Sequence, residues 1–242
     1  VRKEMTDIDY MQRAYTLALK AKGETSPNPM VGSVIVRGNR IIAEGWHAAF
    51  GADHAERMLI KKFDQEVKPN DVLYINLEPC CHHGKTPPCI DSIIESGIRN
   101  VVYGMKDPNP LTNGKSILKL RRNGIKATAG ILQQESEKMN EAFIKYTRKK
   151  LPFVAAKCAQ SLDGKIATAT GKSKWITSEP TRRFARQIRD EFDVIMVGIN
   201  TVLKDDPRLN ARGAGAKPGK PVKVILDSHL RIPITARCLS TS

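Results

Sequence analysis

Three cysteines and two histidines crowd into the thirteen residues from Leu77 to Cys89, LEPCCHHGKTPPC. Thiolate and imidazole are common protein ligands of zinc, which takes four of them in structural sites and three plus a water in catalytic sites. Cys80 follows an apolar run, and Cys89 begins a predicted helix, where exposed N–H groups and the helix dipole favour a thiolate. This pattern predicts that Cys80 and Cys89 bind a metal.

A third ligand is expected from His54-Ala55-Glu56, which opens a predicted helix upstream. Zinc deaminases that act on nucleobases carry a His-x-Glu, in which His binds zinc and Glu transfers protons, followed by Pro-Cys and a second Cys. Here the second cysteine comes nine residues after the first, whereas that signature places it about three residues after. The loop between the cysteines is therefore enlarged. The alternative is a closed structural site in which His82 or His83 is the fourth ligand.

An open coordination position would make the metal catalytic. Zinc lowers the pKa of a bound water from about 15.7 to about 7. Glu56 would accept the proton of that water, pass it to a ring nitrogen and then protonate the departing amine. The predicted chemistry is hydrolytic deamination of an aminated heterocycle, with one catalytic Zn²⁺ per chain held by His54, Cys80 and Cys89.

The elements that position these residues follow from the periodicity of the first part of the chain. Apolar residues at helical spacing predict a helix over 9–21, and two β-rich runs flank Gly38-Asn39, a pair suited to a hairpin turn. Further along, the pattern predicts a helix from 54, a strand over 71–79, a helix from 89 to 97, a strand over 99–105, a helix over 115–123, a short strand over 127–132 and a polar helix over roughly 133–149. This alternation predicts a three-layer α/β unit.

The basic run KYTRKK closes the polar helix, and we place the domain boundary there, giving domains over 1–147 and 148–242. The second domain is expected to contain a strand within PFVAAKCAQSLDGKIA and a helix from Pro180 to about Phe192. The strands DVIMVG and VKVILD follow, separated by a Gly/Pro-rich loop. It ends about ninety residues after it begins, which is short for a doubly wound domain and predicts an incomplete one.

Composition limits the class of protein. The 242 residues are 40% hydrophobic and 27% charged, and no apolar run approaches the ~18 residues of a membrane span, so we expect a soluble globular protein with no membrane partner. The N-terminus lacks a signal peptide's apolar core, and five cysteines, an odd number, fit metal binding in a cytoplasmic protein better than a disulfide framework. The net charge of +15 is spread along the chain, which favours a solvated basic surface over nucleic-acid binding.

Several longer motifs together resemble one family. TSPNPMVGSVIV, EGWH, HAE, LEPCCHHGKTPPC and GMKDPNP resemble the deaminase half of the bifunctional riboflavin-biosynthesis deaminase/reductase. SLDGKIA, GKSKWITS, QIRDEFDVIMVG, TVLKDDPRLNAR and VILDSHLRIP resemble its reductase half. The resemblance implies a cytidine-deaminase-like α/β domain followed by part of a dihydrofolate-reductase-like α/β domain.

The same resemblance implies a reaction and its contacts. The deaminase half would remove the 2-amino group of 2,5-diamino-6-ribosylamino-4(3H)-pyrimidinone 5′-phosphate, and the reductase half would use NADPH to convert the ribosyl side chain to ribityl. Because the family's reductase extends further than this chain, we expect weak or absent NADPH oxidation. Carried over by position, the implied substrate contacts in the first domain are Asn28, His47, His82, Lys85, Asp107 and Asn109.

The resemblance also implies contacts in the second domain, where no G-x-G-x-x-G points to a dinucleotide site. The implied NADPH contacts are Ala159, Trp175, Thr201, Asp205 and Ser228. The implied substrate contacts are Ser173, Arg189, Leu209 and Arg212.

Two other functions compete with this interpretation. A nucleoside or tRNA deaminase shares His-Ala-Glu and Pro-Cys but typically has the short Cys-x-x-Cys loop. A basic zinc-stabilised nucleic-acid-binding module would have a closed metal site, salt-sensitive binding to any duplex and no dependence on Glu56. The sequence leaves the oligomeric state open, a homo-oligomer included.

Overall fold

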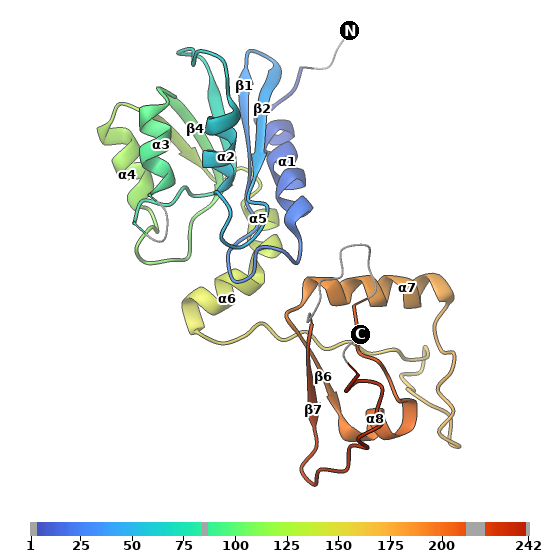
Figure 1. The fold of residues 1–242 in the computed structure, drawn as a ribbon. Helices are drawn as coiled ribbons and strands as arrows, with labels where there is room; N and C mark the ends of the chain where they lie inside the picture. The colour runs from blue at the N-terminus through green and yellow to red at the C-terminus, as the bar shows by residue number, and fades with distance from the viewer. Residues whose placement is uncertain (1–3, 84–86, 212–220, 241–242) are drawn as a thin grey trace. The chain divides into compact units, whose positions relative to one another are not determined.

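The computed structural model describes residues 4–83, 87–211 and 221–240. The chain divides into two compact units, Val1–Val154 and Ala155–Ser242 (Figure 1), somewhat later than the boundary at 147/148 that the sequence suggests. Within the described ranges, no helix has the length and apolar character needed to cross a membrane.

The first unit is organised around a five-stranded sheet with the order β2-β1-β3-β4-β5. The predicted hairpin is formed by β1 (Gly32–Arg37) and β2 (Arg40–Trp46), with a register shift between Ile35 and Val36. β1 is antiparallel to β3 (Val72–Leu77), and β4 (Asn100–Met105) and β5 (Lys126–Ala129) continue the sheet in parallel. The carboxyl ends of β3, β4 and β5 therefore lie on one edge of the sheet.

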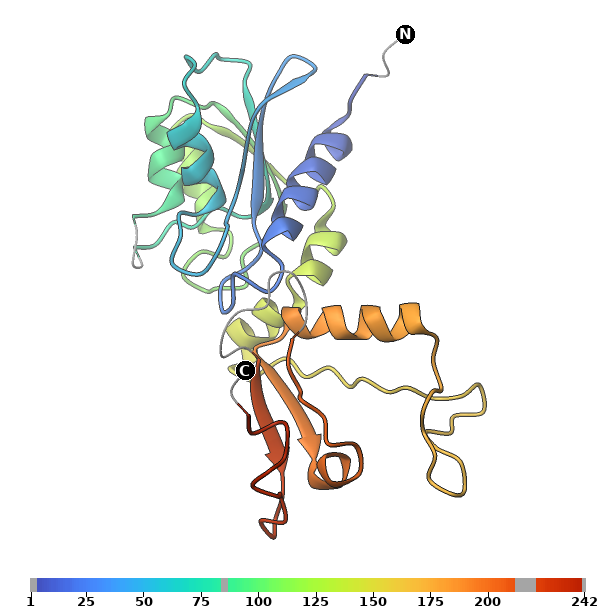
Figure 2. The same cartoon turned by 45° about the vertical axis from the view of Figure 1, so that its right-hand side comes forward.

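Helices cover both faces of this sheet, which confirms the three-layer prediction (Figures 1 and 2). On one face, α1 (Asp7–Ala18), followed by a 3₁₀ turn over Leu19–Ala21, buries Met11 and Leu17 against the strands. The opposite face carries α2 (Ala55–Lys62), α3 (Cys89–Glu95) and α4 (Lys115–Arg122). Its core includes Leu59 of α2 and Ile90 and Ile93 of α3, which are fully buried.

The predicted helix over 133–149 is wrong in one respect, because it is two helices. α5 (Gln133–Met139) and α6 (Glu141–Lys149) meet at Asn140, whose φ of −104° and ψ of 21° are not helical. Asn140 is buried, and its side chain accepts a hydrogen bond from the Met30 N–H (2.8 Å) and donates one to the Met30 carbonyl (3.1 Å). The helix is interrupted where this buried amide satisfies backbone groups that are distant in sequence.

The second unit has a smaller sheet in which β6 (Val194–Gly198) and β7 (Val222–Leu226) are parallel. α7 (Glu179–Gln187), with a 3₁₀ turn over Ile188–Glu191, matches the helix expected from Pro180, and α8 (Ile199–Asp205) follows β6. The strand predicted within 152–167 is wrong: these residues form no strand, and in the described part of this unit β6 and β7 pair only with each other. A segment becomes a strand only where a partner edge receives its backbone hydrogen bonds.

Candidate active site

The three predicted metal ligands come from three different elements of the first unit. His54 is the N-cap of α2, Cys80 lies shortly after β3, and Cys89 is the first residue of α3. One ligand atom from each lies within 4.8 Å of the other two. His54 Nδ1 is 3.1 Å from Cys89 Sγ and 3.6 Å from Cys80 Sγ. Tetrahedral zinc with bonds of about 2.0 Å to nitrogen and about 2.3 Å to sulfur needs ligand separations of about 3.5 to 3.8 Å, so the group is close to the required size.

The chemistry of these donors also fits zinc. A hydrogen bond from Cys89, together with one involving His54, holds the pKa of the Cys80 thiol well below its usual range. The hydrogen bond with Cys80 and burial raise the pKa of the Cys89 thiol. The pair therefore readily supplies one thiolate, and a bound dication would deprotonate the second. The backbone N–H of Cys89 also donates to Cys80 Sγ (3.2 Å).

Among the described residues, neither His82 nor His83, the two candidates for a fourth ligand, joins the cluster. His82 Nδ1 lies 3.0 Å from the Thr112 hydroxyl oxygen instead, and His83 is exposed. Three protein ligands are typical of catalytic zinc sites, which keep a fourth position for water or substrate, whereas structural sites use four. The grouping therefore favours the catalytic interpretation over the closed structural site.

Glu56 lies in the first turn of α2, two residues after the predicted ligand His54, and is only 4% exposed. Burial raises the pKa of its carboxyl group to about 7, and the negative charge of Cys80 acts in the same direction. A carboxyl group that binds and releases a proton near neutral pH suits general acid–base chemistry.

Asn28 and His47 form a pair beside the metal group. Asn28 Nδ2 is 3.1 Å from His47 Nε2, and His47 Nδ1 is 3.0 Å from the Asp53 carbonyl oxygen. Because a carbonyl only accepts, Nδ1 carries the proton and Nε2 accepts from the Asn28 amide. Burial lowers the pKa of His47, which keeps the ring neutral. The rings of His47 and His54 meet edge to face with centroids 5.5 Å apart.

Three further predicted contacts, Asp107, Asn109 and His82, are linked by one series of hydrogen bonds through Thr112. Asp107 Oδ1 accepts from the Asn109 N–H (2.9 Å), and the Asn109 carbonyl accepts from the Thr112 N–H (2.9 Å). Thr112 in turn contacts His82. Asp107 is buried, which raises the pKa of its carboxyl group to about 6. The predicted contact Lys85 lies outside the described residues.

The contacts predicted for the second unit occupy varied environments. Trp175 is 70% exposed, with the Arg182 guanidinium 4.2 Å from its ring centroid, and Asp205 lies 3.6 Å from Lys174 Nζ. Arg189 donates to the Asn210 carbonyl (3.3 Å). The exposed or partly exposed remainder is Ala159, Ser173, Thr201 and Ser228. Leu209 is buried in the small core of this unit, and Arg212 lies outside the described residues.

Sequence reasoning missed two buried polar residues at the end of β3. Asn76 is fully buried, accepts from the Gly32 N–H (2.8 Å) and donates to the Met30 carbonyl (3.0 Å), and so anchors the segment that follows Asn28. Glu78 is 1% exposed and directly follows the strand. The sequence does contain a signal, which is the glutamate directly after an apolar strand. If such a glutamate is buried, it almost always has hydrogen-bonding or charged partners.

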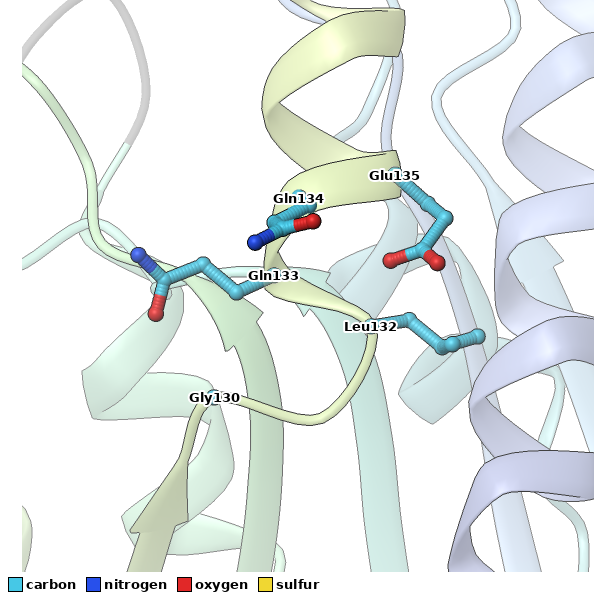
Figure 3. A pocket seen from close by; sticks show the side chains of 5 residues that line it. All are labelled: Gly130, Leu132, Gln133, Gln134 and Glu135. Atoms are coloured by element: carbon cyan, nitrogen blue, oxygen red, sulfur yellow. The ribbon is translucent and has the colours of Figure 1, made fainter.

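The pocket in Figure 3 is separate from these residues. It has a volume of about 460 Å³ and lies at the connection from β5 to α5, where Gly130, Leu132, Gln133, Gln134 and Glu135 line it. No ligand or contact predicted from the sequence is part of its lining.

Comparison with protein families agrees with this geometry. Residues 4–105 match the family described as the cytidine and deoxycytidylate deaminase zinc-binding region, and residues 152–242 match the RibD C-terminal domain family. The sheet, the flanking helices and the His-Cys-Cys group thus define the first unit as a zinc-binding domain of the cytidine deaminase class.

Individual relatives narrow this class. The chain is 45% identical over 240 residues to riboflavin biosynthesis protein RibD of Actinobacillus pleuropneumoniae, covering 99% of this chain and 63% of the relative. It is 46% identical over 235 residues to RibD of Aquifex aeolicus, covering 97% and 65%. The crystal structure of a diaminohydroxyphosphoribosylaminopyrimidine deaminase/5-amino-6-(5-phosphoribosylamino)uracil reductase from Thermotoga maritima superposes with a TM-score of 0.88 at 46% identity, covering 96% of this chain and 66% of that one.

The chain belongs to the RibD family of riboflavin biosynthesis proteins, which confirms the resemblance seen in the motifs. The expected order of a deaminase-like domain and a reductase-like domain is confirmed as well. The chain spans 63–65% of the length of the two curated relatives.

Proposed function

We propose that the first unit is a zinc-dependent deaminase of a phosphorylated aminopyrimidine in riboflavin biosynthesis. The observation that carries this proposal is the grouping of His54, Cys80 and Cys89 next to the buried Glu56. The proposed substrate is 2,5-diamino-6-ribosylamino-4(3H)-pyrimidinone 5′-phosphate. The name of the Thermotoga maritima relative, which includes a deaminase of this compound class, supports that choice.

Each residue of the site has a separate task in the proposed reaction. When bound, zinc supplies a Lewis acid that makes water reactive at neutral pH. His54, Cys80 and Cys89 hold the metal. Glu56 would take one proton from the attacking water and deliver it to the ring nitrogen, and as the C–N bond breaks it would transfer the remaining proton of the new hydroxyl group to the departing amine, which leaves as ammonia. Its position in the first turn of α2 fixes its carboxyl group relative to the ligand His54.

The remaining contacts of the first unit would orient the substrate. The neutral ring of His47, held by the Asp53 carbonyl, sets the direction of the Asn28 amide, whose oxygen would accept from an amino group of the pyrimidine. We place the ribose phosphate near His82 and the loop that begins at Asp107. Lys85, in a Gly-Lys-Thr sequence, would add a point charge and nearby backbone N–H groups.

We propose that the second unit is part of an NADPH-dependent reductase of the kind that, in the full-length family, converts the ribosyl side chain to ribityl. The match to the RibD C-terminal domain family supports this proposal. The exposed ring of Trp175 offers a planar surface of the kind that stacks on aromatic groups. We further propose a cytoplasmic location, because all five cysteines are free and a metal-binding thiolate pair needs a reducing compartment.

Two substitutions test the deaminase. Glu56→Gln should keep zinc but reduce deamination on the order of 10²-fold or more, because the proton transfers lose their carrier. His54→Ala should lose zinc in a metal analysis of the purified protein. His83→Ala is the matched control, since this exposed histidine lies outside the ligand group, and it should retain both properties. Unchanged turnover in Glu56→Gln would refute the mechanism, and stoichiometric zinc in His54→Ala would refute the ligand assignment.

A further inference from the structure

The buried carboxylate of Glu78, which directly follows β3, accepts hydrogen bonds from the backbone of a single loop. Glu78 Oε2 accepts from the N–H groups of Asp107 (3.2 Å) and Gly114 (3.1 Å), and Oε1 accepts from the N–H of Ser116 (3.3 Å). Next to Glu78, the Pro79 carbonyl accepts from the Ser116 hydroxyl (2.6 Å). Both ends of the segment 107–116, called here the substrate loop, are thereby fastened to the end of one strand.

The substrate loop carries the side chains proposed above to meet the substrate. Asp107 and Asn109 lie within it, and Thr112 places its hydroxyl 3.0 Å from His82. Within the loop, the Asn109 carbonyl accepts from the N–H groups of Thr112 and Asn113 (2.9 Å each). These internal bonds shape the turn, whereas the bonds to Glu78 set where the turn lies relative to the strand.

Alternate residues at the end of β3 serve three parts of the site. Asn76 holds the backbone of Met30 and Gly32, which follow Asn28. Glu78 holds the substrate loop, and Cys80 is a ligand of the metal group. Since these residues share one short stretch of backbone, a shift of the substrate loop away from Glu78 is also a shift away from the metal group.

We propose that Glu78 is a positioning residue that fixes the substrate loop relative to the metal group. The proposal rests on the deaminase function proposed above and deepens it. Glu78 acts through Asp107 and Asn109 without touching the reacting atoms, so it governs substrate affinity more than the proton transfers of Glu56. A carboxylate is suited to this task because a charged acceptor binds several N–H groups more strongly than a neutral amide does.

The other end of β3 offers a matched control. Asp71 directly precedes the strand and is fully buried, and its carboxylate accepts from Arg37 Nε and Nη2 and from the Lys68 N–H (2.8 Å each). Asp71→Asn and Glu78→Gln therefore make the same chemical change to a buried carboxylate at opposite ends of one strand. Only Glu78 contacts the substrate loop.

The experiment compares the two variants in steady-state deamination of the phosphorylated pyrimidine, in zinc content and in amide hydrogen exchange. Glu78→Gln should raise KM about tenfold or more while kcat stays within about threefold, since uniform binding is lost and not transition-state stabilisation. Zinc should remain stoichiometric. The amides of Asp107, Gly114 and Ser116 should exchange faster in Glu78→Gln only, and Asp71→Asn should leave KM and kcat unchanged.

Several results would overturn the proposal. These are unchanged exchange at the three amides, an unchanged KM, loss of zinc in Glu78→Gln, or the same rise of KM in both variants. If Glu78→Gln does not fold, Glu78→Asp, which keeps the charge on a shorter side chain, should show a smaller rise of KM and faster exchange at the same amides. A parent protein that does not deaminate the pyrimidine would refute the proposed function instead, and the exchange data would then decide the role of Glu78 without kinetics.

Discussion

Replacing Gly45 with alanine tests how closely the metal site depends on the packing of α2 against the sheet. A Cβ built on Gly45, in β2, would lie 2.6 Å from the Ala55 carbonyl oxygen and 2.7 Å from Leu59 Cβ. Carbon atoms pack at about 3.5 to 4.0 Å, so α2 must move away by roughly 1 Å. The same helix begins after its N-cap His54, a predicted metal ligand, and carries Glu56 in its first turn.

The expected cost follows from these contacts. Overpacking of this kind destabilises a protein by about 1–3 kcal/mol, and a misplacement of about 1 Å can lower turnover about 10²-fold. We expect Gly45→Ala to unfold at lower denaturant concentration and to lose zinc to a chelator more readily than the parent. Gly198→Ala is the control, because that glycine has an ordinary φ of −77° and no atom within 4 Å of the added Cβ. Parent-like stability and zinc retention in Gly45→Ala would refute the argument.

Three further substitutions give expected results of known sign. Asp107→Asn removes a carboxyl group whose pKa is raised by burial from 3.8 to about 6. A carboxyl group whose pKa is raised on folding lowers the free energy of unfolding of the parent as the pH rises, and this loss is complete above about pH 6. In denaturant unfolding, Asp107→Asn should therefore gain about 1 kcal/mol more over the parent at about pH 7.5 than at about pH 5. A gain that grows toward acid pH would contradict this. Tyr103→Phe should raise the free energy of unfolding by about 1 kcal/mol, since the buried Tyr103 hydroxyl has no hydrogen-bond partner among the described residues. A clear loss of stability would instead show that this hydroxyl group makes a hydrogen bond. Asn140→Ala should lower the free energy of unfolding by about 2–4 kcal/mol, because the Met30 backbone loses two hydrogen bonds. It should also raise KM for deamination, because Met30 lies two residues after the proposed substrate contact Asn28. A neutral effect on both stability and KM would show that Asn76 alone holds Met30.

The sequence was sufficient to predict most of the first unit. Its strands are apolar runs bounded by turn residues, and its helices bury residues at helical spacing, so local pattern and final environment agree. The grouping of His54, Cys80 and Cys89 was also predictable, because each stands at the end of an element and together they follow the order of the deaminase signature. The structure then brings their donor atoms together.

The errors share one physical origin, which is dependence on distant partners. The break between α5 and α6 depends on Asn140 binding Met30, 110 residues earlier in the chain. The role of Glu78 depends on N–H groups that arrive from the loop after β4. The segment 152–167, predicted to contain a strand, has no partner strand in the described structure. Periodicity records the environment of a side chain and not the identity of its partner, so these features were not predictable from it.

The unusual spacing of the two predicted cysteine ligands, Cys80 and Cys89, is explained by the hydrogen bonds between them. The Cys89 N–H donates to Cys80 Sγ and the Ile90 N–H donates to the Cys80 carbonyl, both at 3.2 Å. These two hydrogen bonds hold Cys89 next to Cys80, regardless of the number of residues between them. Lengthening the connection from three to nine residues costs only about 1 kcal/mol of loop-closure entropy. Residues can therefore be added between the ligands without disturbing the metal geometry, and one of them, His82, reaches Thr112 of the substrate loop. A spacing that fits no zinc finger is thus compatible with a three-ligand catalytic site, because backbone hydrogen bonds set the ligand geometry and leave the intervening loop available for substrate recognition.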